Sequence, residues 1–155
     1  MSLTIISGGQ TGADRTALEV AEEYGIPTGG WCPLGCRTDE GLAPELVTRF
    51  GLKETKDLGY RNRTRLNVQE ASGTVLFGNV QSPGCTLTIV TCVHHRRPFL
   101  VNPTARELAA WIQREGINTL NVAGNRRRSQ PEIVEQVRTV LRETFTLLRR
   151  DHWIW

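Results

Sequence analysis

Short apolar runs alternate along the chain with longer segments in which apolar residues recur at helical spacing. The apolar runs predict four buried strands, at residues 4–6, 73–77, 98–101 and 119–122. The segments around them predict helices at residues 13–24, 60–71, 85–95, 104–115 and 129–150. Strands that alternate with helices are typical of an α/β protein with a doubly wound, mostly parallel sheet and helices on both faces. We therefore expect that architecture, in one domain over residues 1–155.

Two of these helices rest on more than periodicity. The segment 85–95 is rich in β-branched residues, which favour strands. It lies between two predicted parallel strands, however, and has the length of a crossover helix, so we predict a helix there. For the last helix, Ser129 is a suitable N-cap and Pro131 is suited to the first turn.

The segment 28–59 shows neither period and is rich in Gly, Pro, Cys and Thr, with one short helix suggested at residues 44–50. Irregular segments of this length are unusual in compact domains unless they are functional. Within it, Cys32 and Cys36 are spaced C-x-x-x-C, and Asp39 is a candidate catalytic acid, with a solvated loop carboxylate as the alternative. No second pair has zinc-ligand spacing, so we expect no structural zinc and ordinary loop thiols. A soft metal such as molybdenum or copper remains an alternative for the two thiolates.

Composition narrows the class of protein. The 155-residue chain has a net charge of +3 and four cysteines, too few and too scattered for a disulfide scaffold. Its N-terminus has no charged-then-apolar signal, and no apolar run approaches the roughly 18 residues that span a membrane. We therefore expect a cytoplasmic protein with no membrane partner.

Nearly all the cationic charge is arginine, clustered at residues 61–65, 96–97, 126–128 and 149–150. The guanidinium group matches phosphate and carboxylate oxygens, although any one cluster is also typical of a solvated surface. Acidic residues are interspersed throughout, and no stripe interleaves basic with aromatic residues. We therefore do not expect nucleic acid as a partner.

Three of the loops that follow the predicted strands have unusual compositions, at residues 7–12, 78–86 and 123–129. In doubly wound sheets ligands lie beyond the carboxyl ends of the strands, so we expect these loops to converge on one site. The first loop sets three glycines between strand and helix, which brings backbone N–H groups to an anion, most often a phosphate. The residues that we expect to hold this anion are Ser7, Gly8, Gly9, Gln10, Thr11, Gly12 and Arg15. The alternative is a tight turn with no ligand.

The first loop matches neither common phosphate-binding motif. Ser7 stands where a dinucleotide fingerprint needs glycine, so NAD is not expected, and Arg15 stands where a P-loop needs lysine. The other two loops offer further contacts at helix starts, where the helix dipole also favours anions. These further candidates are Gly84, Thr86, Gly124 and Arg126.

Four segments in order, at residues 6–15, 29–33, 64–68 and 120–124, resemble the putative molybdenum carrier family. That family is similar to a circularly permuted branch of the lysine-decarboxylase-like (SLOG) nucleotide-binding superfamily, and the resemblance spans nearly the whole chain. It implies a Rossmann-like fold that binds a nucleotide or a similar phosphate ligand. For characterised relatives it implies binding of molybdenum cofactor, a pterin phosphate, in an oligomer.

The resemblance departs from the superfamily's nucleoside-monophosphate phosphoribohydrolases, which carry P-G-G-x-G-T-x-x-E with a catalytic glutamate. Aligning Gly8 and Gly9 with that motif puts Arg15 in place of the glutamate. The expected function is therefore a molybdenum cofactor carrier that binds a phosphorylated heterocycle without turnover, with Trp31 as the stacking candidate. The alternatives are a nucleotide-binding sensor module and a nucleoside-monophosphate N-glycosidase, whose acid or base would be Asp14, Glu19 or Asp39.

The small phosphorylated ligand is the expected partner, together with further copies of the chain. Trp153 and Trp155 are costly in a free tail. We expect them to pack on the chain's own domain or on a neighbouring subunit, and we favour the subunit. The chain is therefore predicted to form a homo-oligomer.

Overall fold

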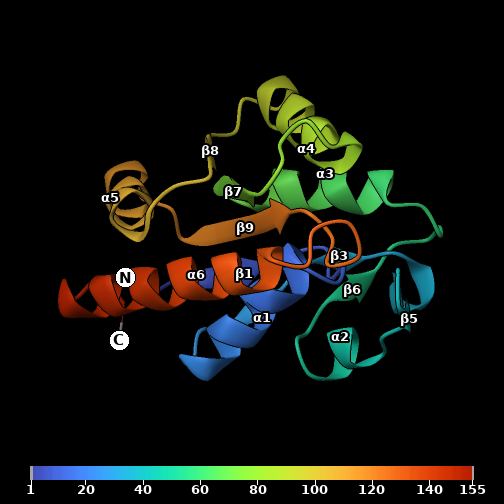
Figure 1. Cartoon of the computed structure of the whole chain (residues 1–155), viewed down its shortest axis with the longest axis horizontal. Helices are drawn as coiled ribbons and strands as arrows, with labels where there is room; N and C mark the ends of the chain where they lie inside the picture. Colours follow the sequence, from blue (N-terminus) through green and yellow to red (C-terminus); the bar gives the residue numbers. More distant parts are fainter. Residues whose placement is uncertain (1, 155) are drawn as a thin grey trace.

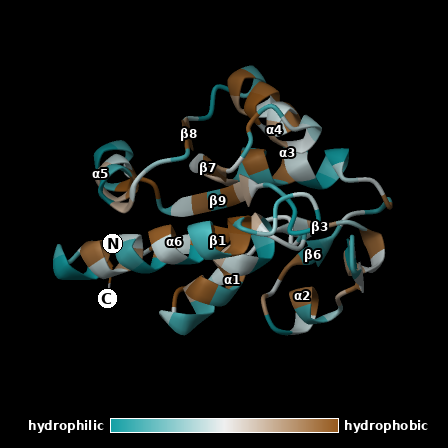
Figure 2. Cartoon of the chain, viewed as in Figure 1, coloured by the Kyte–Doolittle hydropathy of each residue, from teal (hydrophilic) through white to brown (hydrophobic). Residues whose placement is uncertain are grey.

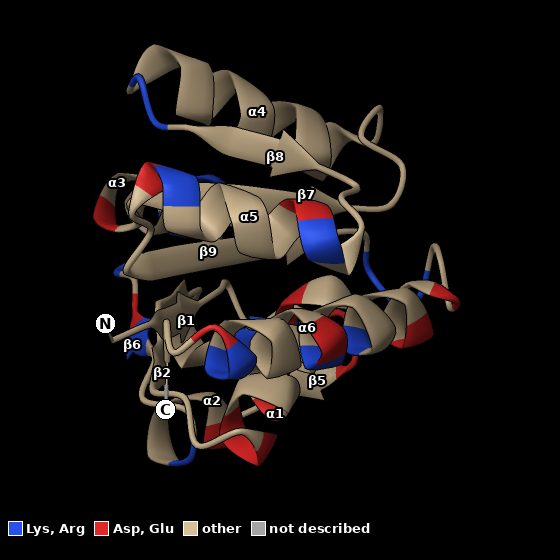
Figure 3. Cartoon of the chain, turned by 90° about the vertical axis from the view of Figure 1, so that its left-hand side faces the viewer, with Lys and Arg blue, Asp and Glu red and all other residues tan. Residues whose placement is uncertain are grey.

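The computed structural model describes residues 2–154, and a five-stranded sheet lies at its centre (Figure 1). The strands lie in the order β2-β1-β9-β7-β8, and each pairs in parallel with its neighbours, as the side view of Figure 3 shows. Their bounds are β1 (Thr4–Ile6), β2 (Thr28–Gly29), β7 (Gly73–Phe77), β8 (Phe99–Val101) and β9 (Thr119–Gly124). The predicted fold class is confirmed: this is a Rossmann-like α/β fold.

Five helices cover the two faces of the sheet. They are α1 (Ala13–Glu23), α3 (Arg61–Glu70), α4 (Pro83–His94), α5 (Ala105–Glu115) and α6 (Ile133–Arg150). The chain runs outward in opposite directions from β1 to β2 and from β7 to β8, so right-handed crossovers place α1 and α4 on opposite faces. Helices α1, α5 and α6 pack together on one face, and α3 packs with α4 on the other (Figure 1).

The main core lies between the sheet and the α1, α5 and α6 layer. It includes Val75, Val122, Leu108 and Phe145, none of which is exposed. Helix α6 alternates polar and apolar residues, whereas α4 is apolar around most of its surface (Figure 2). The β-branched helix α4 confirms the prediction for segment 85–95, because its place between β7 and β8 overrides local strand propensity.

The segment 28–59 is less irregular than its sequence suggests, and here the sequence reading is corrected. It contains β2, which joins the central sheet as a fifth strand, and the helix α2 (Glu45–Thr48). It also contains η1 (Leu34–Cys36) and two small sheets, β3 (Trp31–Cys32) with β6 (Lys53–Glu54) and β4 (Arg37–Thr38) with β5 (Gly41–Leu42). A second core cluster, with Leu46, Phe50 and Leu52, anchors the segment against Leu18 of α1. Two-residue strands are too short for periodicity to reveal them.

Helix α1 ends as its sequence predicts, whereas α6 does not begin as predicted. Gly25 has φ +67° just after α1, and the amide of Ile26 donates to the carbonyl of Ala21, which makes a Schellman ending. Helix α6 begins at Ile133 with Glu132 at the N-cap, so the prediction that Ser129 caps it is wrong. Ser129 lies in a loop whose turn delays the helix by about one turn beyond the predicted start.

The residues after α6 fold back onto the chain. The amide of Trp153 donates to the carbonyl of Leu148 at 2.8 Å, Ile154 is buried, and Trp153 packs against the main core. The favoured expectation for Trp153, packing on a subunit, is thus replaced by packing on its own domain, while Trp155 lies outside the described residues. No helix in the described part of the chain has the length and apolar character needed to cross a membrane.

Candidate functional site

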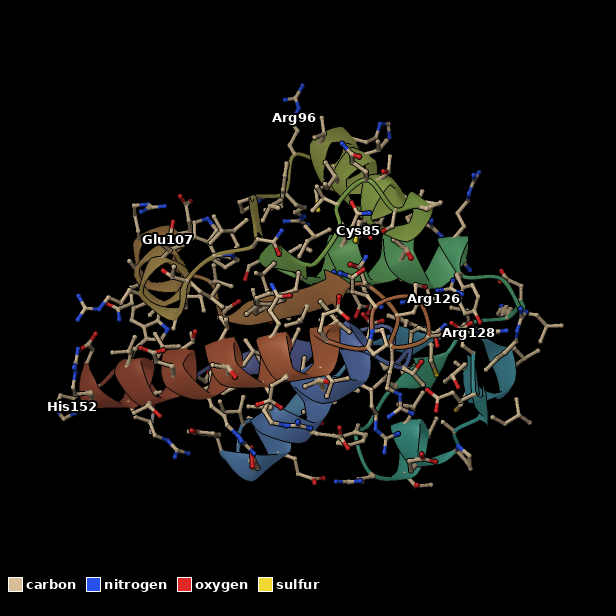
Figure 4. The ribbon with its side chains drawn as sticks, viewed as in Figure 1. Cys85, Arg96, Glu107, Arg126, Arg128 and His152 are labelled. Atoms are coloured by element: carbon tan, nitrogen blue, oxygen red, sulfur yellow. The ribbon has the colours of Figure 1, made fainter. Side chains whose placement is uncertain are left out.

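The carboxyl ends of β7 and β9 open onto a cleft of about 430 Å³. We call it the sheet-edge cleft; its lining includes Ser82, Pro83, Gly84, Gly124, Asn125 and Arg126. A narrower recess of about 70 Å³ shares Gly84, Gly124 and Arg126 with the cleft and reaches inward to Gln10, Asp14 and Arg63. We call it the inner recess. In Figure 4, Cys85 lies at the start of α4 and Arg126 on the loop after β9, near the mouth of this site.

The start of α4 presents its free backbone amides to the cleft. No side chain caps the first turn, which begins with Pro83 and Gly84. A β-carbon built on Gly84 would meet no atom within 4 Å, so this position faces open space. The N–H groups of a helix start, with the positive end of the helix dipole, form a site suited to anions.

Asn125 ties the loops after β7 and β9 together and fixes the cleft's walls. Its side-chain oxygen accepts from the amide of Asn79 at 2.5 Å, and its Nδ2 donates to Ser82 Oγ at 3.1 Å. Only 7% of the residue is exposed. Nearby, Gly124 is required because a β-carbon there would lie 2.7 Å from that of Ala13.

Backbone amides of the first glycine loop, at residues 7–12, donate hydrogen bonds to other groups of the chain itself. The amide of Gly9 donates to Ser7 Oγ, that of Gln10 to Asp14 Oδ2, and that of Thr11 to Gln10 Oε1. Gly12 pairs with the loop after β9 in an isolated bridge, and the amide of Ala13 donates to the carbonyl of Asn125. The close approaches that these glycines permit are therefore approaches of other parts of the chain.

A buried ion pair forms the floor of the inner recess. Arg63 Nη1 lies 3.0 Å from Asp14 Oδ2, with only 13% and 7% of the two side chains exposed. Burial raises the pKa of the Asp14 carboxyl despite the nearby Arg63 guanidinium, which lowers it. Arg63 also passes over Gly8, whose missing side chain makes room for it.

Two buried donors at the recess have no hydrogen-bond partner within the described residues. They are Gln10 Nε2 and Arg63 Nε. The other end of the Gln10 amide is held, because Oε1 accepts from the amides of Thr11 and Asp39. Buried donors are nearly always paired, so this recess has unused capacity to donate hydrogen bonds.

Tyr60 gathers arginines at the mouth of the recess. The guanidinium groups of Arg126, Arg37 and Arg63 lie 4.8, 5.1 and 5.2 Å from its ring centre. Arg126 Nη1 also pairs with Asp39 Oδ1 at 2.8 Å. The site therefore combines several arginine cations with the uncapped start of α4.

The predicted site residues divide between different places. Gln10, Gly84, Gly124, Arg126 and the candidate acid Asp14 line the cleft or recess, as predicted for converging loops, and Asp39 reaches Arg126.

Other predicted residues lie elsewhere. Gly9, Thr11, Gly12, Arg15 and Glu19 line a separate cleft of about 440 Å³, where Arg15 pairs with Glu45 at 2.9 Å. Thr86 is exposed, and its hydroxyl donates to the carbonyl of Val80. Trp31, in β3, lies beneath the Lys53 ammonium and lines neither the cleft nor the recess.

The two loop cysteines lie together but inside the smaller core. Their Sγ atoms are 3.8 Å apart, and both residues are buried. Burial, with Cys36 beside it, raises the pKa of the Cys32 thiol to about 12, and burial also raises that of Cys36. Metal binding needs thiolates, and the described residues contain no group of three or more His, Cys, Asp or Glu that could hold a metal ion.

Three residues of the site were not predicted as site residues: Tyr60, Arg63 and Asn125. Arg63 was noted only within the arginine cluster at residues 61–65, and Asn125 only within the loop at residues 123–129. Tyr60 and Arg63 belong to the start of α3, which follows no strand of the central sheet. The rule that places ligands at strand ends therefore does not reach them. Asn125 did carry a signal, because it is a polar residue directly after a buried strand.

The chain is similar to a known protein family and to a solved structure. A model of the circularly permuted YpsA SLOG family matches residues 5–145. The crystal structure of a putative molybdenum carrier protein from Syntrophus aciditrophicus SB is 33% identical, and the alignment covers 92% of this chain and 94% of that chain with a TM-score of 0.84. No curated protein matches the chain.

A second solved structure, (E)-4-hydroxy-3-methyl-but-2-enyl diphosphate reductase, aligns at 14% identity over 92% of this chain and 59% of that one. Its TM-score of 0.38 is too low to support an argument. The family model and the first structure each cover most of the chain, and they confirm the resemblance seen in its sequence segments. The chain belongs to the circularly permuted YpsA SLOG family.

Proposed function

We propose that this protein is a carrier that binds a phosphorylated heterocycle, of the nucleotide or molybdenum cofactor class, in the sheet-edge cleft. The phosphate would lie at the start of α4, with the amides of Gly84 and Cys85 and the Arg126 guanidinium as its donors. The observation that carries this proposal is the open, uncapped start of α4, which faces a cleft lined by Arg126. The unpaired Gln10 amide beside it is an independent sign of an unused polar partner.

The size of the site supports this ligand class. A cleft of about 430 Å³ falls within the usual range for small-molecule sites, roughly 300–1,000 Å³. The inner recess, at about 70 Å³, is suited to one small polar group of the ligand. The first glycine loop would then act as the wall between the ligand and α1, and Ser7 and Gly8 would support that wall.

The placement of the carboxylates favours binding over hydrolysis. Asp14 is held by Arg63, and Asp39 is held by Arg126. Glu19 lies in the separate cleft beside Arg15. An N-glycosidase needs a carboxylate that can reach the reacting atoms, and each of the three candidates is either paired with an arginine or lies outside the site.

A molybdenum-containing cargo would be held by its organic part. The structural neighbour's name points to molybdenum, but the described residues offer no cluster of metal ligands. Contacts with such a cargo would therefore run through its phosphate and its heterocycle.

The test is binding of phosphorylated probes by wild type and by Gly84→Leu. The added side chain would occupy open space in the cleft and leave the packed core untouched. The probes are adenosine monophosphate, guanosine monophosphate and a pterin phosphate. We expect at least one of them to bind wild type. Gly84→Leu should bind that probe at least about tenfold more weakly, a loss of roughly 1.4 kcal/mol. Ala110→Leu, which adds the same side chain to an exposed position of α5, is the control and should bind as wild type does.

Isothermal titration gives the dissociation constants, and mass spectrometry of molecules released from the purified protein identifies the natural ligand. Equal binding by wild type and Gly84→Leu would exclude the sheet-edge cleft as the site. Release of free base from a nucleoside monophosphate would instead support the alternative function, a nucleoside-monophosphate N-glycosidase.

A further inference from the structure

The residues 37–42, which form β4, β5 and the turn between them, make a small hairpin beside the site. We call it the 37–42 hairpin. None of its six residues is buried, and Leu42 is 71% exposed. The residues at its two ends, Cys36 and Ala43, pack in the second core cluster, whereas the hairpin itself is held mainly by polar contacts. Elements of this kind open at low free-energy cost.

Its contacts converge on residues of the proposed binding site. Asp39 Oδ1 pairs with Arg126 Nη1 at 2.8 Å, and the Asp39 amide donates to Gln10 Oε1 at 2.9 Å. Next to them, Glu40 pairs with Arg127. The hairpin is therefore attached to the loop after β9 by two adjacent ion pairs.

The Asp39 carboxylate pairs with the Arg126 guanidinium, which lines both the cleft and the recess. The Asp39 side chain is only 12% exposed, so water screens its charge poorly, whereas the Arg126 side chain is 41% exposed. A phosphate at the start of α4 would bring further negative charge to the same guanidinium. Two anions that share one cation at close range repel each other, and the weakly anchored one is displaced.

We propose that the 37–42 hairpin is a lid that Asp39 holds closed and that the ligand's phosphate releases by competing for Arg126. This inference rests on the proposed function. Asp39 acts here as an internal competitor, which raises the ligand concentration needed to occupy the site. The hairpin then opens when the ligand binds. A carrier with such a lid has one conformation without its ligand and another with it.

The test compares wild type with Asp39→Asn, using inorganic phosphate and adenosine monophosphate as probes. We expect Asp39→Asn to bind both probes about two- to fivefold more tightly, the gain that corresponds to removing a partly exposed ion pair. Hydrogen exchange of the 37–42 amides should speed up in wild type when either probe is added. In Asp39→Asn exchange should already be fast without a probe.

Glu23→Gln is the matched control. It removes one negative charge from another arginine pair, with Arg142 at 2.8 Å, far from the cleft, and should bind the probes as wild type does. Unchanged or weaker binding by Asp39→Asn, or slower exchange of the hairpin on binding, would overturn the lid. If Gly84→Leu abolishes binding while Asp39→Asn leaves it unchanged, the lid fails and the binding site stands. If Gly84→Leu binds as wild type does, the site itself fails.

Discussion

Asp14 is the residue at which burial and ion pairing oppose each other most directly. Burial raises the pKa of its carboxyl above the ordinary value of 3.8, and Arg63 only partly offsets this. A carboxyl whose pKa is raised by folding favours the folded state while it is protonated. That contribution is complete below pH 3.8 and is lost as the pH rises through the folded-state pKa.

We therefore predict a pH-dependent difference between wild type and Asp14→Asn. The free energy of unfolding of wild type, relative to the variant, should fall as the pH rises above 3.8, as measured by urea denaturation at a series of pH values. Glu23→Gln should show the opposite slope, and only below pH 4.5, because the hydrogen bond with Arg142 lowers the pKa of Glu23 below that ordinary value. A wild-type advantage over Asp14→Asn that grows with pH would mean that the pair with Arg63 outweighs burial.

The site residues that the sequence revealed are those near strand ends. Gly84 and Arg126 could be predicted because they follow β7 and β9, whose carboxyl ends meet at one sheet edge. Arg15 was predicted from its place beside the glycines, but it lies in the next cleft because its side chain turns toward Glu45. The direction of a side chain depends on tertiary partners, and local motifs do not specify it.

At the level of elements, the starts of α5 and α6 can be compared, because a side chain caps one and not the other. Helix α5 has a capping box, in which Thr104 Oγ1 accepts from the Glu107 amide and the Glu107 side chain accepts from the Thr104 amide. Ser129 makes no such bond to α6. We predict that Thr104→Ala lowers the free energy of unfolding by about 1 kcal/mol, whereas Ser129→Ala changes it by less than about 0.5 kcal/mol. Equal losses, measured by thermal or urea unfolding, would restore Ser129 as a cap.

Most elements could be predicted because each leaves a signal longer than one turn or one strand pair. The strand β7, with five consecutive buried residues, and the amphipathic α5 are examples. The strand β2 left no such signal, because only Thr28 and Gly29 pair with β1. What places β2 in the sheet is the Schellman ending of α1 and the second core cluster, and both depend on the folded chain.

At the level of the whole molecule, the question is whether the end of the described chain packs on its own fold. Ile154 is 6% exposed within a single copy and belongs to the main core, with Trp153 packed beside it. The homo-oligomer stays a prediction, but it is not needed to bury these side chains.

We predict that Ile154→Ala lowers the free energy of unfolding by roughly 2–5 kcal/mol, the usual cost of removing a buried isoleucine side chain. Because the contact lies within one copy, the loss should be the same at every protein concentration, as measured by urea unfolding over a hundredfold dilution. Size-exclusion chromatography with light scattering gives the oligomeric state of both proteins in the same samples. If Ile154 instead packs between subunits, the loss will grow as the protein is concentrated and the variant will dissociate, because subunit association then contributes to measured stability. A constant loss at unchanged oligomeric state identifies the packing as internal and directs the search for any subunit interface to another surface.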